Sequence, residues 1–354
     1  MMKNNQNKKN RQPTAEEQFR KMAVLAAGIC ENRPWEHAGC PGPFVCYYDD
    51  GMETYIYILI TDDAGNRGFR IYHTRRDYAR SCTPYDTREK NLRKDIETVY
   101  DAVFFCDWEN LPEEEQNTFE RLSLRFPDGC WPRFVSKRCG CLTVVPLGSD
   151  EYETMEDCLQ HFKAQLDAMR ESGELARFKQ GEVAQRCYDA EAKAWKHSFA
   201  RTVKMLMRRE PLMIEPNALV VQELKKAPYS EDIPEMEMDF GWLIPEHLDS
   251  LADGYEFEML VVLADRESKE VLLEYACDPE AFDVCVVEAI KDVVSEHGKP
   301  RTIYVSRDYS ADSLCDLARW GNIRLAQVNS VPGAASGLHH EGAVYYRELC
   351  LVAR

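Results

Sequence analysis

The chain has 354 residues, of which 44% are hydrophobic, 10% aromatic and 30% charged, a composition that excludes a disordered or fibrous protein. At about 150 residues per domain, this length predicts two domains. The 61 acidic and 44 basic residues give a net charge of −17, which repels polyanions at long range and argues against a general nucleic-acid coat.

The N-terminus predicts a tail followed by a helix. Residues 1–13 contain four basic side chains and no acidic one, and with almost nothing to bury they predict a disordered basic tail. Apolar residues then recur at helical spacing over 15–31, a better match to an amphipathic helix than to a signal peptide. The 14 cysteines include no Cys-x-x-Cys pair, so we expect reduced, mostly buried thiols and a cytoplasmic protein.

The rest of the N-terminal half predicts an antiparallel meander with helices. Three apolar, aromatic-rich runs are separated by turn-forming residues, as in consecutive β-hairpins. Helical periodicity and two further short strands follow them. The predicted strands are 44–48, 54–60, 68–72, 102–106 and 141–146, and the predicted helices are 89–100, 112–125 and 155–169. We therefore expect an α+β domain over residues 14–210.

A long amphipathic helix is predicted over 181–209, at the end of this domain. At 100° per residue, its apolar positions share one face and its basic positions the other. A cationic stripe of this kind suits a phosphate or an acidic partner protein, and the alternative is an ordinary solvated helix face. The candidate binding residues are Arg186, Lys193, Lys204 and Arg208.

The stretch 211–250 predicts a connector between the domains. It contains five prolines, which interrupt regular structure. Between Ala227 and Asp265 there are eleven acidic residues and no Lys or Arg. Docking of this acidic stretch on the basic stripe would compete with any external anion.

Residues 251–354 predict a second domain of the order ββαβαβ. A buried strand and an alternating partner form a hairpin, and a βαβ unit with a right-handed crossover follows. The predicted strands are 257–264, 270–276, 301–305 and 323–328, and the predicted helices are 279–297 and 310–320. We expect a mixed sheet.

Three short segments resemble a bacterial family of uncharacterised two-domain proteins. They are Gly298–Val305 with the following Arg307-Asp308, Gly65–Tyr72, and Trp131–Phe134. The resemblance implies the two-domain architecture and no known activity. In the family pattern an acidic residue commonly stands where this chain has Asn66, which leaves no acid–base role for that position.

The ββαβαβ order also resembles a trimmed ribonuclease H or integrase core, in which carboxylates at strand ends hold two divalent metals. Asp265 ends the first predicted strand, Asp308 follows a later one, and Glu341 lies 33 positions further on. Such a site needs at least three carboxylates that converge on the metals. One strand of the full core is missing from the prediction, so the alternative function is a degenerate metal-dependent nuclease. A hairpin-turn role competes for Asp265.

Screening for other chemistry leaves no catalytic template. Phosphate-binding loops, dinucleotide-binding turns, zinc-protease helices and serine-hydrolase elbows are all missing from the sequence. Four soft ligands, Cys139, Cys141, Cys158 and His161, have spacings compatible with zinc, but we favour buried thiols and a surface histidine as the explanation. We expect no metal or cofactor, and a non-enzymatic protein that acts through a binding surface.

Overall fold

The computed structural model describes two compact units of α+β structure. The N-terminal unit comprises 1–83, 98–138 and 144–209, and the C-terminal unit comprises 84–97, 139–143 and 210–354. The predicted fold class is confirmed, with antiparallel strands in the first unit and a mixed sheet in the second. No helix of the described part is long and apolar enough to span a membrane. The described residues are 13–36, 43–47, 54–62, 64–82, 94–178, 181–200, 218–243, 255–306 and 308–340.

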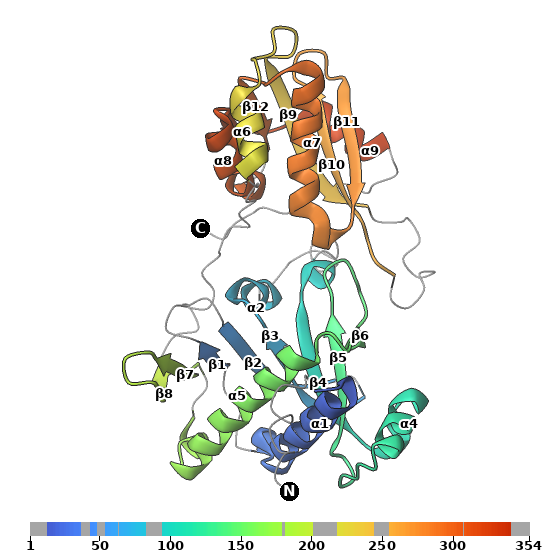
Figure 1. Ribbon diagram of the computed structural model, residues 1–354, viewed down its shortest axis with the longest axis vertical. Coiled ribbons are helices and arrows are strands. Elements are labelled where there is room, and N and C mark those ends of the chain that lie inside the picture. Colours follow the sequence, from blue (N-terminus) through green and yellow to red (C-terminus); the bar gives the residue numbers. More distant parts are fainter. Residues whose placement is uncertain are drawn as a thin grey trace, which may run out of the picture. The chain divides into compact units, whose positions relative to one another are not determined.

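The N-terminal unit is built on an eight-stranded sheet (Figure 1). Its strand order is β6-β5-β4-β3-β2-β1-β7-β8, and all neighbours are antiparallel except β1 and β7, which run parallel. The predicted meander is therefore extended at one side by a hairpin. The strands are β1 (Phe44–Tyr47), β2 (Thr54–Thr61), β3 (Arg67–Tyr72), β4 (Tyr100–Cys106), β5 (Trp131–Lys137), β6 (Val145–Pro146), β7 (Val183–Asp189) and β8 (Ala194–Ala200).

Helices cover both faces of this sheet. Helices α1 (Ala15–Glu31) and α5 (Tyr152–Glu171) lie side by side on one face. Between them and the sheet, Phe162 stacks on Tyr57 with ring centroids 4.4 Å apart, and the Tyr57 hydroxyl donates to the Cys158 carbonyl at 2.9 Å. Helix α4 (Glu113–Arg121) contributes Phe119 to the same core. The other face packs on α2 (Arg75–Cys82) through a second apolar cluster.

Helix α1 begins and ends as the sequence predicts. The Thr14 hydroxyl accepts from the Glu17 backbone N–H, and the Glu17 carboxylate accepts from the Thr14 backbone N–H. This reciprocal capping satisfies N–H groups that the first helical turn leaves unpaired. The local sequence alone is sufficient to place this helix.

The long helix predicted over 181–209 is wrong, because residues 183–200 form the β7–β8 hairpin. Alternate residues of both strands, among them Ala184, Trp195 and Phe199, pack on the α5 side of the sheet. The apolar positions therefore fit a period of two as well as a period of 3.6. The pairing of β7 with the edge strand of the meander, β1, favours strands over a helix, because it provides hydrogen-bond partners for backbone groups along β7.

The C-terminal unit is built on a five-stranded sheet of order β11-β10-β9-β12-β13. Strand β10 is antiparallel to β9 and β11, whereas β12 is parallel to β9 and β13. Helices α6, α7 and α8 pack on one face, and α9 packs on the other. The elements are α6 (Ala218–Lys226), β9 (Glu235–Trp242), β10 (Met259–Asp265), β11 (Val271–Cys277), α7 (Phe282–His297), β12 (Thr302–Val305), α8 (Asp308–Gly321), β13 (Arg324–Gln327) and α9 (Pro332–His340).

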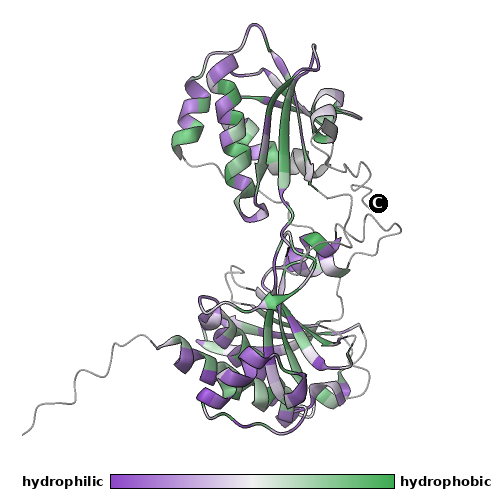
Figure 2. Ribbon diagram, turned by 90° about the vertical axis from the view of Figure 1, so that its right-hand side faces the viewer, coloured by the Kyte–Doolittle hydropathy of each residue, from purple (hydrophilic) through white to green (hydrophobic). Residues whose placement is uncertain are grey.

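The strands of this sheet are rich in apolar residues because both faces of the sheet are covered. Along β10, Val261 and Leu263 face the three-helix side, whereas Val262 and Ala264 face α9. A strand buried on both faces carries a continuous apolar run. Figure 2 shows this as green strands inside each unit, with helices that carry both green and purple residues.

The stretch 211–250 differs from the predicted connector, because α6 and β9 lie within it and belong to the C-terminal unit. Strand β9 is the middle strand of the sheet and adds a first strand to the predicted ββαβαβ order. Its apolar residues alternate with Glu235, Glu237 and Asp239. Charged groups are rarely buried without partners, so these acidic residues favoured an exposed connector over a buried strand.

The C-terminal unit also includes short segments from the first half of the chain. Ile96 is fully buried in its core, and its carbonyl accepts from the Gly140 N–H at 3.0 Å. The Gly140 carbonyl in turn accepts from the Phe257 N–H at 2.7 Å. The predicted boundary, which assigned all of 14–210 to the first domain, thus differs from the contacts of the described residues 94–97 and 139–143, which belong to the C-terminal unit.

Lys299 lies in one of the segments that resemble the family, and its side chain has a structural role. Its ammonium donates to the Lys225 carbonyl near the end of α6 at 3.4 Å and to the Gly321 carbonyl at the end of α8 at 3.1 Å. It also lies 4.6 Å from the centre of the Tyr229 ring. A cation at helix C-termini satisfies unpaired carbonyls and the helix dipole. Burial lowers the pKa of Lys299.

Glu237 joins three elements of the C-terminal unit. Its fully buried carboxylate accepts from the Lys269 ammonium at 2.7 Å and from Arg266 at 3.1 Å, both from the β10–β11 turn. Its other oxygen accepts from the Gly333 N–H at 2.6 Å, in the first turn of α9. A buried carboxylate is tolerated only when it is paired in this way.

Replacing Glu237 with Gln should therefore destabilise the C-terminal unit. We expect the free energy of unfolding to fall by about 2 kcal/mol. The variant leaves the two cations without a carboxylate partner and weakens the hydrogen bond from α9. Urea unfolding followed by circular dichroism measures this. The exposed Glu267→Gln change in the same turn is the control and should stay within about 0.5 kcal/mol of the parent. Equal stabilities of the two variants would contradict the role given to Glu237.

Candidate functional site

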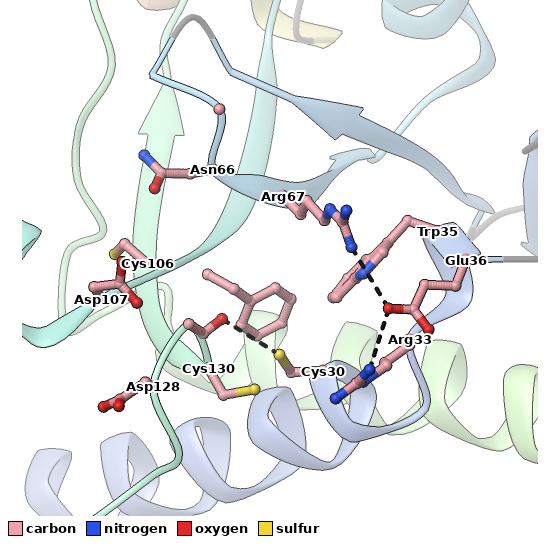
Figure 3. A pocket seen from close by; sticks show the side chains of 13 residues that line it. Cys30, Arg33, Trp35, Glu36, Asn66, Arg67, Cys106, Asp107, Asp128 and Cys130 are labelled. Carbon is pink, nitrogen blue, oxygen red and sulfur yellow. Dashed lines mark hydrogen bonds and ion pairs between the residues drawn. The ribbon is translucent and has the colours of Figure 1, made fainter.

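A pocket of about 370 Å³ lies in the N-terminal unit, where α1 ends (Figure 3). Four segments far apart in sequence line it: residues 30–36 at the end of α1, the β2–β3 turn at 65–67, the end of β4 at 105–107, and the turn before β5 at 128–130. Its volume is within the range of about 300–1,000 Å³ that is typical of small-molecule sites. The pocket is therefore the candidate functional site.

One wall of the pocket carries its cations. Arg33 and Arg67 both approach Oε1 of Glu36, at 3.3 and 3.7 Å. The Arg67 guanidinium also lies 6.0 Å from the centre of the Trp35 ring. Two arginines share one carboxylate, so this wall keeps a net positive charge. Both side chains are more than half exposed, and exposed ion pairs of this kind hold their groups weakly.

The opposite wall carries carboxylates. Figure 3 shows Asp107 and Asp128 on the side of the pocket away from Arg33 and Arg67. Asp107 follows β4, and Asp128 lies in the turn in which the Cys130 N–H donates to the Pro127 carbonyl at 3.0 Å. The charges of the pocket are thus separated into an acidic end and a basic end.

Asn66 is held at the rim by its own turn. Its backbone N–H and its side-chain amide donate to the two oxygens of Asp62, at 2.7 and 2.9 Å. Gly65 makes the turn possible with a φ of 85°, which favours glycine. A carboxylate at position 66 would repel Asp62, so an amide suits this turn.

Aromatic rings and thiols lie between the two charged ends. The Trp35 and Phe105 rings pack with centroids 5.6 Å apart. The thiol of Cys30 donates to the Gly129 carbonyl at 3.7 Å, next to Cys130 in the chain. Burial raises the pKa of Cys30 well above its usual range and that of Cys106 to about 11. Burial therefore favours the neutral form of these two thiols, and no histidine lines the pocket.

The predicted basic stripe does not form as a single surface in the described part. Arg186 is buried on β7, where it donates to Nδ1 of His161 at 2.8 Å and lies 4.4 Å from the centre of the Trp195 ring. Lys193 lies in the exposed turn before β8. Lys204 and Arg208 lie outside the described residues. The correction follows from strand geometry, in which alternate residues point to opposite faces.

Of the three carboxylates of the nuclease alternative, the structure describes only the side chain of Asp265. Asp265 lies opposite Met236 on β9, level with the start of β12, whereas Asp308 begins α8 beyond the end of β12. Burial by itself would raise the pKa of Asp265, but hydrogen bonds from the Ser268 side chain and from the Glu267 and Ser268 N–H groups lower it. Asp265 thus closes the β10–β11 turn. Glu341 lies outside the described residues.

The four candidate zinc ligands belong to different units. Cys139 and Cys141 are part of the C-terminal unit, and Cys158 and His161 are part of the N-terminal unit. Cys158 lies on the buried face of α5, and burial raises the pKa of its thiol. Among the described residues, no group of three or more His, Cys, Asp or Glu side chains is placed to hold a metal ion.

Sequence reasoning missed the pocket because its walls are far apart along the chain. Its one signal was the resemblance, since Gly65, Asn66 and Arg67 from one of the similar segments line the pocket. Another similar segment begins at Trp131, directly after Cys130. No family model matches the chain, and comparisons with curated proteins and with solved structures also find no match.

The buried His161 makes the stability of the N-terminal unit depend on pH. Burial lowers its pKa, the nearby Arg186 lowers it further, and Asp157 opposes them. The unfolded chain therefore binds a proton at pH values where the folded chain does not. We expect the free energy of unfolding to fall as the pH decreases below about 6.5, and urea titrations between pH 5 and pH 8 measure this.

His161→Gln should reduce this pH dependence, because glutamine does not titrate. Glu191→Gln, in the exposed turn between β7 and β8, is the control and should retain the full slope. The same slope in His161→Gln and in the parent would show that His161 is not the responsible group.

Proposed function

We propose that this protein acts by binding, without catalysis, and that the pocket of its N-terminal unit takes a small zwitterionic molecule. The separation of charge within the pocket carries the proposal. A ligand with an amino group and an acidic group would pair the amino group with Asp107 and Asp128. Its acidic group would pair with Arg33 and Arg67, and charge-assisted hydrogen bonds are among the strong ones.

The remaining lining suits such a ligand. Trp35 and Phe105 offer apolar contact for the part of the molecule between its charges. Arg67 is held by ion pairing at 3.7 Å rather than by a close hydrogen bond, so an incoming anion competes easily with Glu36. An arginine fork binds carboxylate and phosphate groups in a defined orientation.

The composition of the lining supports binding over catalysis. Burial raises the pKa of the Cys30 and Cys106 thiols, and the lining contains no histidine, serine or lysine. The cysteines include no Cys-x-x-Cys pair, and reduced thiols suit a reducing compartment. We therefore also propose a cytoplasmic location and, from the sequence resemblance, membership in the bacterial two-domain family.

Calorimetric titration tests the proposal with a panel of amino acids, taurine and phosphoethanolamine. Acetate, phosphate and ethylamine carry one charge type each and should bind more weakly than the best zwitterion. Arg67→Gln and Asp128→Asn should each weaken that binding by roughly 10- to 100-fold, since each removes one charge-assisted contact.

Arg121→Gln is the control, because Arg121 is an exposed cation on α4 that pairs with Glu16. It should bind the ligand as the parent does. A zwitterion that binds no tighter than the single-charge compounds would contradict the proposal. Unchanged affinity in both pocket variants would contradict it too.

A further inference from the structure

Two thiols from distant segments of the chain, those of Cys30 and Cys130, line the pocket. Cys30 ends the buried face of α1, and Cys130 lies in the turn that leads into β5. The Cys30 thiol donates to the carbonyl of Gly129, the residue before Cys130, at 3.7 Å, and the neighbouring Cys130 thiol contributes to the raised pKa of Cys30. Figure 3 shows the two sulfur atoms near each other among the side chains that line the pocket. Their separation by 100 positions in the chain means that only the fold brings them together.

We propose that Cys30 and Cys130 are an oxidation site, at which hydrogen peroxide converts the two thiols into a disulfide. Cys130 is half-buried and Cys30 is 3% exposed, and both line a cavity of about 370 Å³. A molecule as small as peroxide therefore reaches Cys130 from the pocket. This site goes beyond the proposed ligand binding and does not depend on it.

The chemistry balances in two steps. The Cys130 thiolate attacks one oxygen of the peroxide, the O–O bond breaks, and the leaving hydroxide takes a proton to become water. Cys130 is then a sulfenic acid. The Cys30 sulfur attacks the Cys130 sulfur, the S–O bond breaks, and the leaving hydroxide takes the Cys30 proton. The two thiols are oxidised, and one peroxide is reduced to two waters.

The environments of the thiols assign these roles. Burial and the contact with Cys130 raise the pKa of Cys30 well above its usual range, so Cys30 stays protonated until its partner has been oxidised. Its contact with Cys130 then places it to attack the sulfenic acid. Cys130 is the nucleophile and Cys30 is the resolving thiol.

A second pair of thiols in the C-terminal unit provides an internal comparison. The neighbouring Cys285 thiol contributes to the raised pKa of Cys277, and both side chains are buried, at 6% and 9% exposure. Neither is among the residues that line the pocket beside Cys130. Oxidation susceptibility follows access to the thiolate. Peroxide should therefore link Cys30 to Cys130 well before it links Cys277 to Cys285.

Mass spectrometry tests the proposal on the full chain. The reduced protein is treated with a few equivalents of hydrogen peroxide, blocked with N-ethylmaleimide and digested without reduction with trypsin and a glutamate-specific protease. Cys30 and Cys130 fall on separate peptides, 22–31 and 126–133, each with a single cysteine. We expect these two peptides to be linked, with a loss of two hydrogen masses that dithiothreitol reverses. The linked chain should melt roughly 5–15 °C higher, since the bond closes a long loop.

Three variants complete the test. In Cys30→Ser, Cys130 should accumulate as a sulfenic acid that dimedone traps, because the resolving thiol is gone. Cys130→Ser should give no link, and the exposed Cys82→Ser change should leave the link intact. The proposal is overturned if Cys130 links to another cysteine, if Cys82 and Cys315 are oxidised while 22–31 and 126–133 stay unlinked, or if Cys277–Cys285 forms equally fast. None of these outcomes depends on whether a zwitterion binds.

Discussion

The burial of both faces of each sheet is the constraint on which this structure depends. Helices α1 and α5 cover one face of the N-terminal sheet and α2 the other, and the C-terminal sheet lies between α9 and three further helices. A charged residue on a covered strand therefore needs partners inside the protein. Arg186 has His161 and Trp195, and Glu237 has two cations and a helix N–H.

This constraint separates structural charges from those available to a ligand. Arg186 was a candidate binding residue, yet its guanidinium is enclosed between α5 and the β7–β8 hairpin. Arg33 and Arg67 form exposed ion pairs with Glu36, and Arg67 also lies near the Trp35 ring. An exposed cation that is weakly paired within the protein can give up that partner for a ligand, and the protein loses little stability. The location of a charge in the fold, more than its place in a sequence pattern, decides its use.

The pocket combines this charge separation with two thiols that the fold holds in contact. Its walls come from the ends of α1 and β4 and from two turns, none of which belongs to the centre of a core. Such segments carry functional groups on a rigid scaffold, because changes there leave the core intact. A disulfide between Cys30 and Cys130 would join the α1 wall to the turn before β5. Ligand binding and oxidation would then act on the same walls.

Local patterns in the sequence determined much of the secondary structure, including the capped helix α1, the strands of the meander and the α+β class. They failed at 183–200 and at β9, where tertiary pairing and buried ion pairs decided the outcome. A period of two and a period of 3.6 overlap over short stretches, and a carboxylate such as Glu237 is recognisable as buried only once its partners are placed. The pocket belongs wholly to the tertiary structure, because Cys30, Arg67, Asp107 and Cys130 are neighbours only after the sheet has brought their segments together.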